Sequence, residues 1–456
     1  MDIEKIVKKQ KTFFMTGKTK EVKYRKEALK KLKQKIIELE PEINQALKAD
    51  LNKSETESYM TETGMVFSEL SYAIKHIKQW SKEKKVRTPL SQFHGKSYYF
   101  YEPYGVALII SPWNYPFMLA LDPLIGAIAA GNCCIIKPSE YAPNTAKIMK
   151  KMIEDIFSSE YITVIEGEVE ETTQLLKQRL DYIFFTGSVS VGKIIMKVAS
   201  ENLIPVTLEL GGKSPCIVDE TADLSLTAKR ILFGKILNAG QTCVAPDYLL
   251  VQRNIKEKLI QELEKSIVKF LGENSLKNQD YVKMINQKQF NRMKELLKNQ
   301  KIIFGGNIDD ANQKIEFTLI DEPSPDSKVM QEEIFGPILP ILSFDKIEEA
   351  IDFIRQREKP LALYLFTKNK KVEERIKKEV SFGGGCINDT IIHLASNYLG
   401  FGGVGNSGMG NYHGKRSFTT FSHEKSIVKK YTWIDLPMRY MPYTKAKQKV
   451  IRMFLK

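Results

Sequence analysis

The sequence has little of the chemistry that metal sites or disulfide frameworks require. It contains five cysteines and five histidines among 456 residues. The number of cysteines is odd, and no CxxC pair or suitably spaced histidine forms a metal-ligand pattern. We therefore expect no metal site, and we expect reduced thiols in the cytoplasm. The cysteines are Cys133, Cys134, Cys216, Cys243 and Cys386.

Long apolar runs and nucleic-acid motifs are also missing. No apolar stretch reaches the length of about 18 residues that suggests a membrane span, and residues 1–11 are too charged for a signal peptide. The formal net charge is +14. However, most lysines are scattered along helical patterns beside acidic residues, and no RNP-like, helix-turn-helix or zinc-finger pattern accompanies them. We therefore expect no nucleic-acid partner.

The C-terminal tail differs from the other basic segments. Residues 436–456 are basic and end in apolar residues, a combination compatible with weak contact with an anionic lipid surface. A frayed terminus, or one packed against a partner, is the more ordinary explanation of such a tail.

Hydrophobic patterning divides the chain into a helical N-terminal part and an alternating part. Three- and four-residue apolar spacing predicts helices over residues 2–50 and 62–82, and an aromatic strand follows at 97–101. From Gly105 onward, apolar strands alternate with helices, which indicates a parallel sheet covered on both faces. The predicted strands are 106–110, 134–136, 161–165, 182–185 and 205–208.

A second alternating unit begins after the Gly211-Gly212 pair and runs to about Gly385. It is followed by a glycine-rich loop at 400–408 and an extended segment near 426–431. The sequence therefore predicts an α/β fold in which a Rossmann-like cofactor sheet precedes a second α/β domain. Ligands of such sheets bind at the carboxyl ends of the strands.

A candidate nucleophile lies in the segment GQTCVAP at residues 240–246. Cys243 sits there among small and polar residues, where a substrate can reach it, and thiolate is a strong nucleophile. A lone cysteine is more often structural, so a catalytic interpretation of Cys243 requires a second reactive group. Glu209 supplies an isolated carboxylate in an apolar run before a glycine turn. The two suggest covalent catalysis followed by base-assisted release.

Asn114 is a candidate oxyanion donor. It lies in the segment SPWNYP at residues 111–116, where two prolines fix a loop directly after a predicted strand. A neutral amide N–H at a strand end can stabilise developing negative charge. Taken alone, the segment is equally well an Asx turn before a helix.

Two strand-to-helix turns are candidates for binding a dinucleotide. Gly187, Ser188 and Gly192 lie where a strand ends and a helix begins, which suits a pyrophosphate, although the spacing is not GxGxxG. Lys137 and Glu140 follow another strand and can bond the ribose hydroxyls. A carboxylate there favours NAD over NADP, because a 2′-phosphate would meet negative charge. An ordinary turn and a helix cap remain the alternatives.

Glu333 and Phe335 place a carboxylate and an aromatic ring at a rigid turn before Gly336-Pro337. On its own, this segment is more typical of a surface turn. The segment becomes informative only when it is considered together with the other motifs.

In this order along nearly the whole chain, the motifs resemble those of the aldehyde dehydrogenase superfamily. The short length, residues 360–364 and residues 405–415 resemble its class 3 and fatty aldehyde dehydrogenase branch. There are two departures. Gly400 stands where the family has proline, and the hydrophobic tail of membrane-anchored members is absent.

The resemblance implies a role for each matched residue. Cys243 is the catalytic thiol, Glu209 the general base, and Asn114 the oxyanion donor together with the Cys243 amide. The cofactor-binding positions are Lys137, Glu140, Gly187, Ser188, Gly192, Glu333 and Phe335. Tyr115 and His413 belong to the substrate pocket.

The resemblance also implies a domain plan and a homodimer. It places an NAD(P)-binding domain at 1–83 and 103–210, a catalytic domain at 211–411, an oligomerisation β-flap at 84–102 and 412–435, and a basic tail at 436–456.

The implied reaction is oxidation of a medium- or long-chain aliphatic or an aromatic aldehyde to its acid. It proceeds through a thiohemiacetal and a thioester, with NAD as cofactor and NADP possible. Alternatives are a cysteine-dependent esterase, an acyl-transferring semialdehyde dehydrogenase, and a non-enzymatic structural or membrane-surface protein on the same scaffold.

Overall fold

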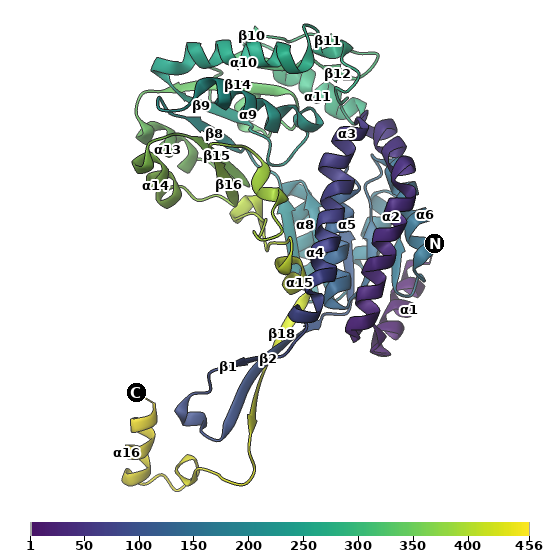
Figure 1. Ribbon diagram of the computed structural model, residues 1–456, viewed down its shortest axis with the longest axis vertical. Helices are drawn as coiled ribbons and strands as arrows, with labels where there is room; N and C mark the ends of the chain where they lie inside the picture. The colour runs from purple at the N-terminus through teal and green to yellow at the C-terminus, as the bar shows by residue number, and fades with distance from the viewer. Residues whose placement is uncertain (1, 456) are drawn as a thin grey trace.

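Two parallel sheets with flanking helices form the body of the molecule, and a long antiparallel arm extends from it (Figure 1). The structure is a computed structural model that describes residues 2–455. The expected α/β class is confirmed.

The first sheet carries the order β17-β7-β6-β3-β4-β5. Its five central strands are parallel, and only the short β17 runs antiparallel. These strands are buried apolar runs, as expected when helices cover both faces of a sheet. All five parallel strands lie where the sequence predicts strands. The bounds are β3 (Val106–Ile110), β4 (Cys133–Lys137), β5 (Ile162–Val164), β6 (Tyr182–Gly187), β7 (Val206–Leu210) and β17 (Gly408–Met409).

The helix α5 (Met118–Ala130) is entirely buried against this sheet, and α2 (Val22–Leu51) and α4 (Gly64–Trp80) pack outside it (Figure 1). Between α2 and α4 the chain forms α3 (Glu55–Ser58) and a π-helical turn, Tyr59–Thr63, which replaces the start of the helix predicted at residue 62. The remaining helices of this part are α1 (Ile3–Met15), α6 (Pro143–Ile156), α7 (Val169–Leu176) and α8 (Val189–Glu201). The hydrophobic pattern does not predict α7.

The second sheet has the order β10-β13-β14-β9-β8-β15-β16 and is parallel except at β10. Its strands are β8 (Pro215–Val218), β9 (Tyr248–Gln252), β10 (Ile302–Phe304), β13 (Thr318–Asp321), β14 (Ile338–Phe344), β15 (Ala362–Phe366) and β16 (Gly384–Ile387). Its helices include α9 (Leu224–Ile236), α10 (Lys256–Leu271), α11 (Gln287–Leu297), α13 (Ile347–Arg355) and α14 (Lys370–Glu379).

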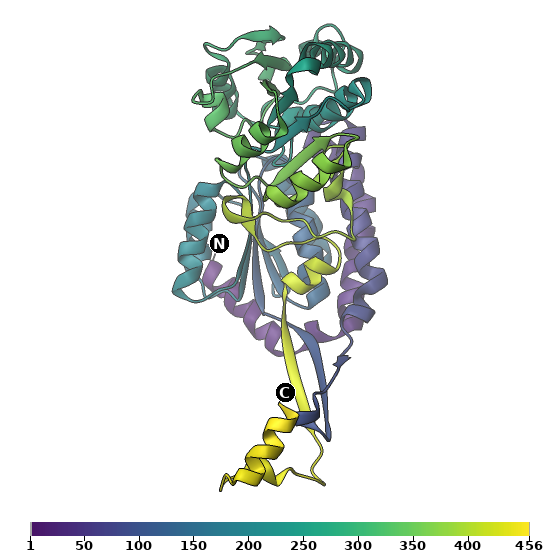
Figure 2. The ribbon, with the colours of Figure 1, turned by 90° about the vertical axis from the view of Figure 1, so that its left-hand side faces the viewer.

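The arm is a separate three-stranded sheet of β1 (Lys84–Val86), β2 (Gly95–Pro103) and β18 (Ser422–Lys430). Strands β2 and β18 pair over nine positions, from Pro103 opposite Ser422 to Gly95 opposite Lys430. The short helix α15 (Lys415–Thr420) joins the arm to α5. The tail forms α16 (Lys445–Phe454) beyond the tip of the arm (Figure 2), and residue 456 lies outside the described residues. The extended segment predicted near 426–431 is confirmed as part of β18.

Candidate functional site

Cys243 is carried by a sharply bent loop between α9 and β9. Asn238, Ala239 and Gly240 take left-handed conformations in succession, with φ of 53°, 49° and 74°. At Gly240 a side chain is excluded, because a Cβ would lie 2.3 Å from the Gly336 carbonyl oxygen. The loop therefore needs glycine at this point to bring Cys243 to the place where two cavities meet.

We call the first cavity the polar pocket. It has a volume of about 290 Å³ and lies at the carboxyl ends of β3, β6 and β7, where ligands of parallel sheets are expected. Most of the residues predicted for catalysis and cofactor binding line it together. Its lining includes Asn114, Gly187, Ser188, Glu209, Cys243, Glu333 and Phe335.

The second cavity, which we call the apolar pocket, reaches Cys243 from the other side. It has a volume of about 130 Å³, and its lining is almost wholly apolar. Both residues predicted for the substrate pocket lie in its wall: Tyr115 and His413. The wall also contains Met60, Met65, Met118, Phe233, Leu237 and Phe401.

Hydrogen bonds hold both the side chain and the backbone carbonyl of Asn114. Its Nδ2 donates to the Gln241 carbonyl oxygen at 3.0 Å, and its own carbonyl oxygen accepts from the side chains of Lys53 and Asn238. An amide nitrogen has two hydrogens, so one N–H of Asn114 is left for a ligand in the polar pocket. The side chain is 2 % exposed, which keeps competing water away.

Burial favours the neutral forms of the acid–base groups in the polar pocket. Burial, followed by the negative charges of Glu333 and Glu209, raises the pKa of the Cys243 thiol to about 12. Burial also raises the pKa of Glu209 well above its usual range, and neither of its carboxyl oxygens has a protein partner. Two titratable groups that line one cavity can take part in proton transfer to a ligand.

Glu333 and Phe335 line the polar pocket, and Glu333 lies against Gly211, directly after β7. A Cβ on Gly211 would lie 2.1 Å from Glu333 Oε2, so this glycine lets the carboxylate approach the backbone. Glu333 Oε1 has no protein partner, and burial raises its pKa to about 8. The Phe335 ring meets Trp113 edge to face at 5.3 Å. This pair forms an aromatic wall of two roughly perpendicular rings on the same pocket as the unpartnered Glu333 oxygen.

The first turn of α8 supplies a backbone surface for a phosphate. Ser188 caps the helix by accepting from Val191 N, and Gly187 and Ser188 border the polar pocket. A Cβ on Gly192 would lie 2.7 Å from Leu210, so glycine allows α8 to pack closely against β7. The N-terminus of this helix presents free N–H groups and a positive dipole end.

Lys137 and Glu140 lie outside both pockets, although they follow β4 at the same edge of the sheet. The Lys137 ammonium is buried and donates to the Pro138 carbonyl oxygen at 2.8 Å. The helix N-terminus, the aromatic wall and the unpartnered carboxylates are chemically suited to a dinucleotide, and Lys137 and Glu140 are the predicted cofactor residues that the structure does not bring into this cavity.

Several lining residues had no signal in the sequence. Arg292 and Gln289 reach the polar pocket from α11, and Arg292 donates to the carbonyl oxygens of Glu333 and Ile334. In the sequence, Gln289 and Arg292 show only the three-residue spacing that is typical of one face of a helix. Tyr412 lines the apolar pocket beside His413, and the two rings stack at 4.2 Å. Burial lowers the pKa of His413 to about 4, so its imidazole is neutral at pH 7.

Among the residues that the structure describes, neither a metal-binding cluster nor a membrane-spanning helix is found. Within residues 2–455, no three histidine, cysteine or acidic side chains gather into a metal-binding group. In the same range, no helix combines the length and the apolar character needed to cross a bilayer.

Comparison with known proteins identifies the family. Residues 1–427 match the model described as the aldehyde dehydrogenase family. The chain is 52 % identical over 448 residues to 4,4'-diaponeurosporen-aldehyde dehydrogenase of Staphylococcus aureus, covering 98 % of this chain and 97 % of that one. It is 44 % identical to the dimeric NADP-preferring aldehyde dehydrogenase of Canis lupus familiaris, covering 96 % and 98 %.

A solved structure agrees. The substrate-bound state of Staphylococcus aureus AldH superposes with a TM-score of 0.98 at 52 % identity, covering 100 % of both chains. The resemblance to the class 3 branch is confirmed, and the family oxidises aldehydes with NAD or NADP. The chain belongs to the aldehyde dehydrogenase family.

Proposed function

We propose that this enzyme oxidises medium- or long-chain aliphatic aldehydes, or aromatic ones, and that Cys243 carries the acyl group. The observation that supports the proposal is the position of Cys243 between an apolar and a polar pocket. An apolar tail gains free energy by leaving water, at about 25 cal/mol per Å² buried. The apolar pocket therefore holds the tail and leaves the carbonyl carbon beside the thiol.

The chain's own residues account for attack and release. The Cys243 thiolate adds to the aldehyde carbon, and the free N–H of Asn114, together with the Cys243 backbone N–H, stabilises the oxyanion. The residues of the polar pocket would hold NAD or NADP, which would supply the hydride acceptor needed to convert the thiohemiacetal on Cys243 into a thioester. Glu209, in its carboxylate form, then takes a proton from water, whose oxygen attacks the thioester. The carbon–sulfur bond breaks, the thiolate of Cys243 is restored, and the acid is released.

For the cofactor, we infer that the nicotinamide end lies against Glu333 and Phe335, the pyrophosphate at Gly187 and Ser188 with Gly192 behind it, and the adenosine ribose near Lys137 and Glu140. The unpartnered Oε1 of Glu333 supports the first assignment. Glu140 favours NAD, whereas a 44 % identical relative is named NADP-preferring. Both cofactors therefore belong in the test.

An aldehyde panel with NAD and NADP tests the proposal. Turnover should rise with the apolar area of the aldehyde and should require a cofactor. The aldehyde named for the Staphylococcus aureus relative belongs in the panel. A preference for short, polar aldehydes would contradict the substrate class.

Two controls separate the other reactions of the same thiol. Because Glu209 provides a base for hydrolysis, added coenzyme A should not raise the rate. A clear increase would instead identify an acyl-transferring enzyme. Ester hydrolysis without cofactor should stay below the dehydrogenase rate, and a faster rate would identify an esterase.

We also infer a homodimer in the cytoplasm, with weak contact of the tail with anionic lipid as an addition. The dimer is supported by the long arm and its exposed residues, such as Val428 at 53 % and Trp433 at 70 % exposed. The cytoplasmic location is supported by the five cysteines, which are all free thiols. The described part of the tail exposes Met453 and Leu455 among basic residues. Light scattering tests the dimer, and salt-sensitive liposome sedimentation lost on truncation tests the lipid contact.

A further inference from the structure

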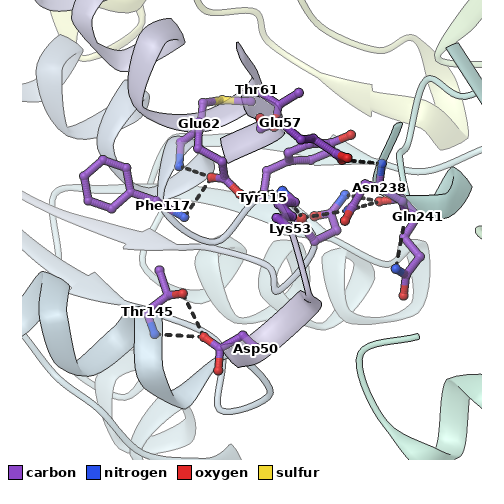
Figure 3. A network of polar contacts seen from close by, with 12 residues as sticks. Asp50, Lys53, Glu57, Thr61, Glu62, Tyr115, Phe117, Thr145, Asn238 and Gln241 are labelled. Atoms are coloured by element: carbon purple, nitrogen blue, oxygen red, sulfur yellow. Dashed lines mark hydrogen bonds and ion pairs between the residues drawn. The ribbon is translucent and has the colours of Figure 1, made fainter. Parts of the chain in front are cut away.

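A fully buried ion pair lies directly behind the point where the two pockets meet. Lys53 Nζ is 2.6 Å from Glu62 Oε1, and neither side chain has any exposed area. Figure 3 shows this pair on either side of Tyr115, within a network that extends to Asn238 and Gln241. Buried pairs of this kind add little to net stability when compared with apolar replacements. A contribution to stability therefore does not explain why Lys53 and Glu62 contact residues of the site.

Lys53 reaches the two residues that divide the pockets. Its Nζ donates to the Asn114 carbonyl oxygen at 3.2 Å and lies 4.0 Å from the Tyr115 ring centroid. Asn114 borders the polar pocket and Tyr115 the apolar pocket. One ammonium therefore braces adjacent residues that face opposite cavities.

Glu62 fixes the same segment one turn further along the chain. Its Oε2 accepts from the backbone N–H groups of Phe117 and Met118, at 3.1 and 2.8 Å. These are free donors at the start of α5, where a carboxylate is favourable. The ion pair therefore holds the segment at 114–118 through both of its partners.

The network continues to the loop that carries the thiol. Asn238 Nδ2 donates to the carbonyl oxygens of Asn114 and Gln241, and the Asn238 backbone N–H donates to Glu57. Tyr115 and Thr242 share a hydrogen bond of 2.6 Å, one residue from Cys243. The oxyanion donor and the nucleophile are thus held relative to one another by Lys53, Glu62 and Asn238, which line neither pocket, and by the Tyr115–Thr242 hydrogen bond in the wall of the apolar pocket.

We propose that Lys53, paired with Glu62, is a positioning residue that sets Asn114 relative to Cys243. This rests on the proposed role of Asn114 as oxyanion donor. A misplacement of about 1 Å in such a donor can cost on the order of 100-fold in rate. Lys53→Met should therefore lower kcat by about 10- to 100-fold, while the aldehyde KM and the number of titratable Cys243 thiols stay nearly unchanged.

A double-mutant cycle between Lys53→Met and Asn114→Ala tests the proposal. Asn114→Ala alone should lower kcat by about 100- to 1000-fold. Because Lys53 acts through Asn114, adding Lys53→Met to Asn114→Ala should lower kcat by less than about twofold more. Losses that multiply would overturn the positioning role. No loss in Asn114→Ala would instead contradict the proposed function.

Two further variants keep the test decisive. If Lys53→Met leaves Glu62 unpaired and does not fold, Lys53→Met with Glu62→Gln removes both charges and should fold with the same loss of kcat. Lys256→Met is the matched control, because Lys256 is 9 % exposed and pairs with Asp321 and Glu322 away from the pockets. It should lower the melting temperature and leave kcat unchanged. A paired variant that melts lower but keeps wild-type kcat would show a purely structural role.

Discussion

The two pockets that meet at Cys243 are built from different kinds of parts. The polar pocket is formed largely by strand ends, glycine backbone and buried carboxylates, as at Gly187, Glu209 and Gly211. The apolar pocket is formed by side chains from the π-helical turn, α5, α9 and the loop near Ile391. The chemistry is therefore set by backbone geometry at the sheet, whereas the choice of aldehyde is set by side chains that can change without disturbing it.

Removing the atom shared by both pockets should have the largest effect. Cys243→Ala should lower aldehyde oxidation by about 10⁵-fold or more, because no acyl acceptor remains. Cofactor binding, measured by calorimetry, should be retained because the polar pocket is intact. Cys386→Ala is the matched control, since Cys386 is a partly buried thiol outside both pockets. Near-normal turnover in Cys243→Ala would contradict the thioester route.

Changing only the polar pocket should separate the two halves of the reaction. In Glu209→Gln, deacylation should slow by about 100- to 1000-fold, because water loses its base. The first burst of reduced cofactor, followed by stopped-flow absorbance, should keep its amplitude. An unchanged steady state after an unchanged burst would contradict the role of Glu209 as base.

The charge of the polar pocket should appear in the pH dependence of the thiol. Burial, Glu333 and Glu209 raise the pKa of Cys243 to about 12. Only the thiolate reacts, and its fraction rises tenfold per pH unit below the pKa. Inactivation of the free enzyme by iodoacetamide should therefore speed up by about 100-fold from pH 7 to pH 9. Glu333→Gln should raise the rate at pH 9, where the Glu333 carboxyl, with a pKa of about 8, is ionised, and a rate independent of pH would contradict the raised pKa of the thiol.

Changing only the apolar pocket should have the smallest and most selective effect. Phe233→Ala should lower kcat/KM for long-chain aldehydes by about tenfold, because it removes apolar contact area. Short aldehydes should be nearly unaffected. Phe270→Ala on α10 is the matched control, since Phe270 has a similar exposure, 42 % against 38 %, but lies outside the pocket. Equal losses in both variants would show a general loss of stability.

The sequence was informative where local pattern and tertiary structure agree. The strands β3, β6 and β7 are apolar runs bounded by turn residues, and their carboxyl ends bring Asn114, Gly187 and Glu209 to one cavity. The parallel direction of the strands follows from their alternation with helices, whereas the order of the strands in the sheet is visible only in the structure. The catalytic roles were suggested by the family resemblance rather than by periodicity.

The sequence could not predict the groups that meet only through packing. Lys53 lies in the short link between α2 and α3, and Glu62 follows nine residues later in the π-helical turn. Charged residues in such segments are normally solvated. The π-helical turn has no pattern of its own, and it shifts Glu62 into the protein interior. The position of Arg292 likewise depends on how α11 docks beside the segment at Glu333 and Ile334, which no sequence motif indicates.

The π-helical turn at Tyr59–Thr63 has a consequence for protein engineering. Met60 and Thr61 face the apolar pocket, while the next residue, Glu62, pairs with Lys53 behind Asn114. Side-chain exchanges at Met60 or Thr61 are therefore suitable for redesigning substrate choice. An insertion or deletion in this turn would rotate Glu62 out of register, so libraries that vary loop length here should be depleted of active clones.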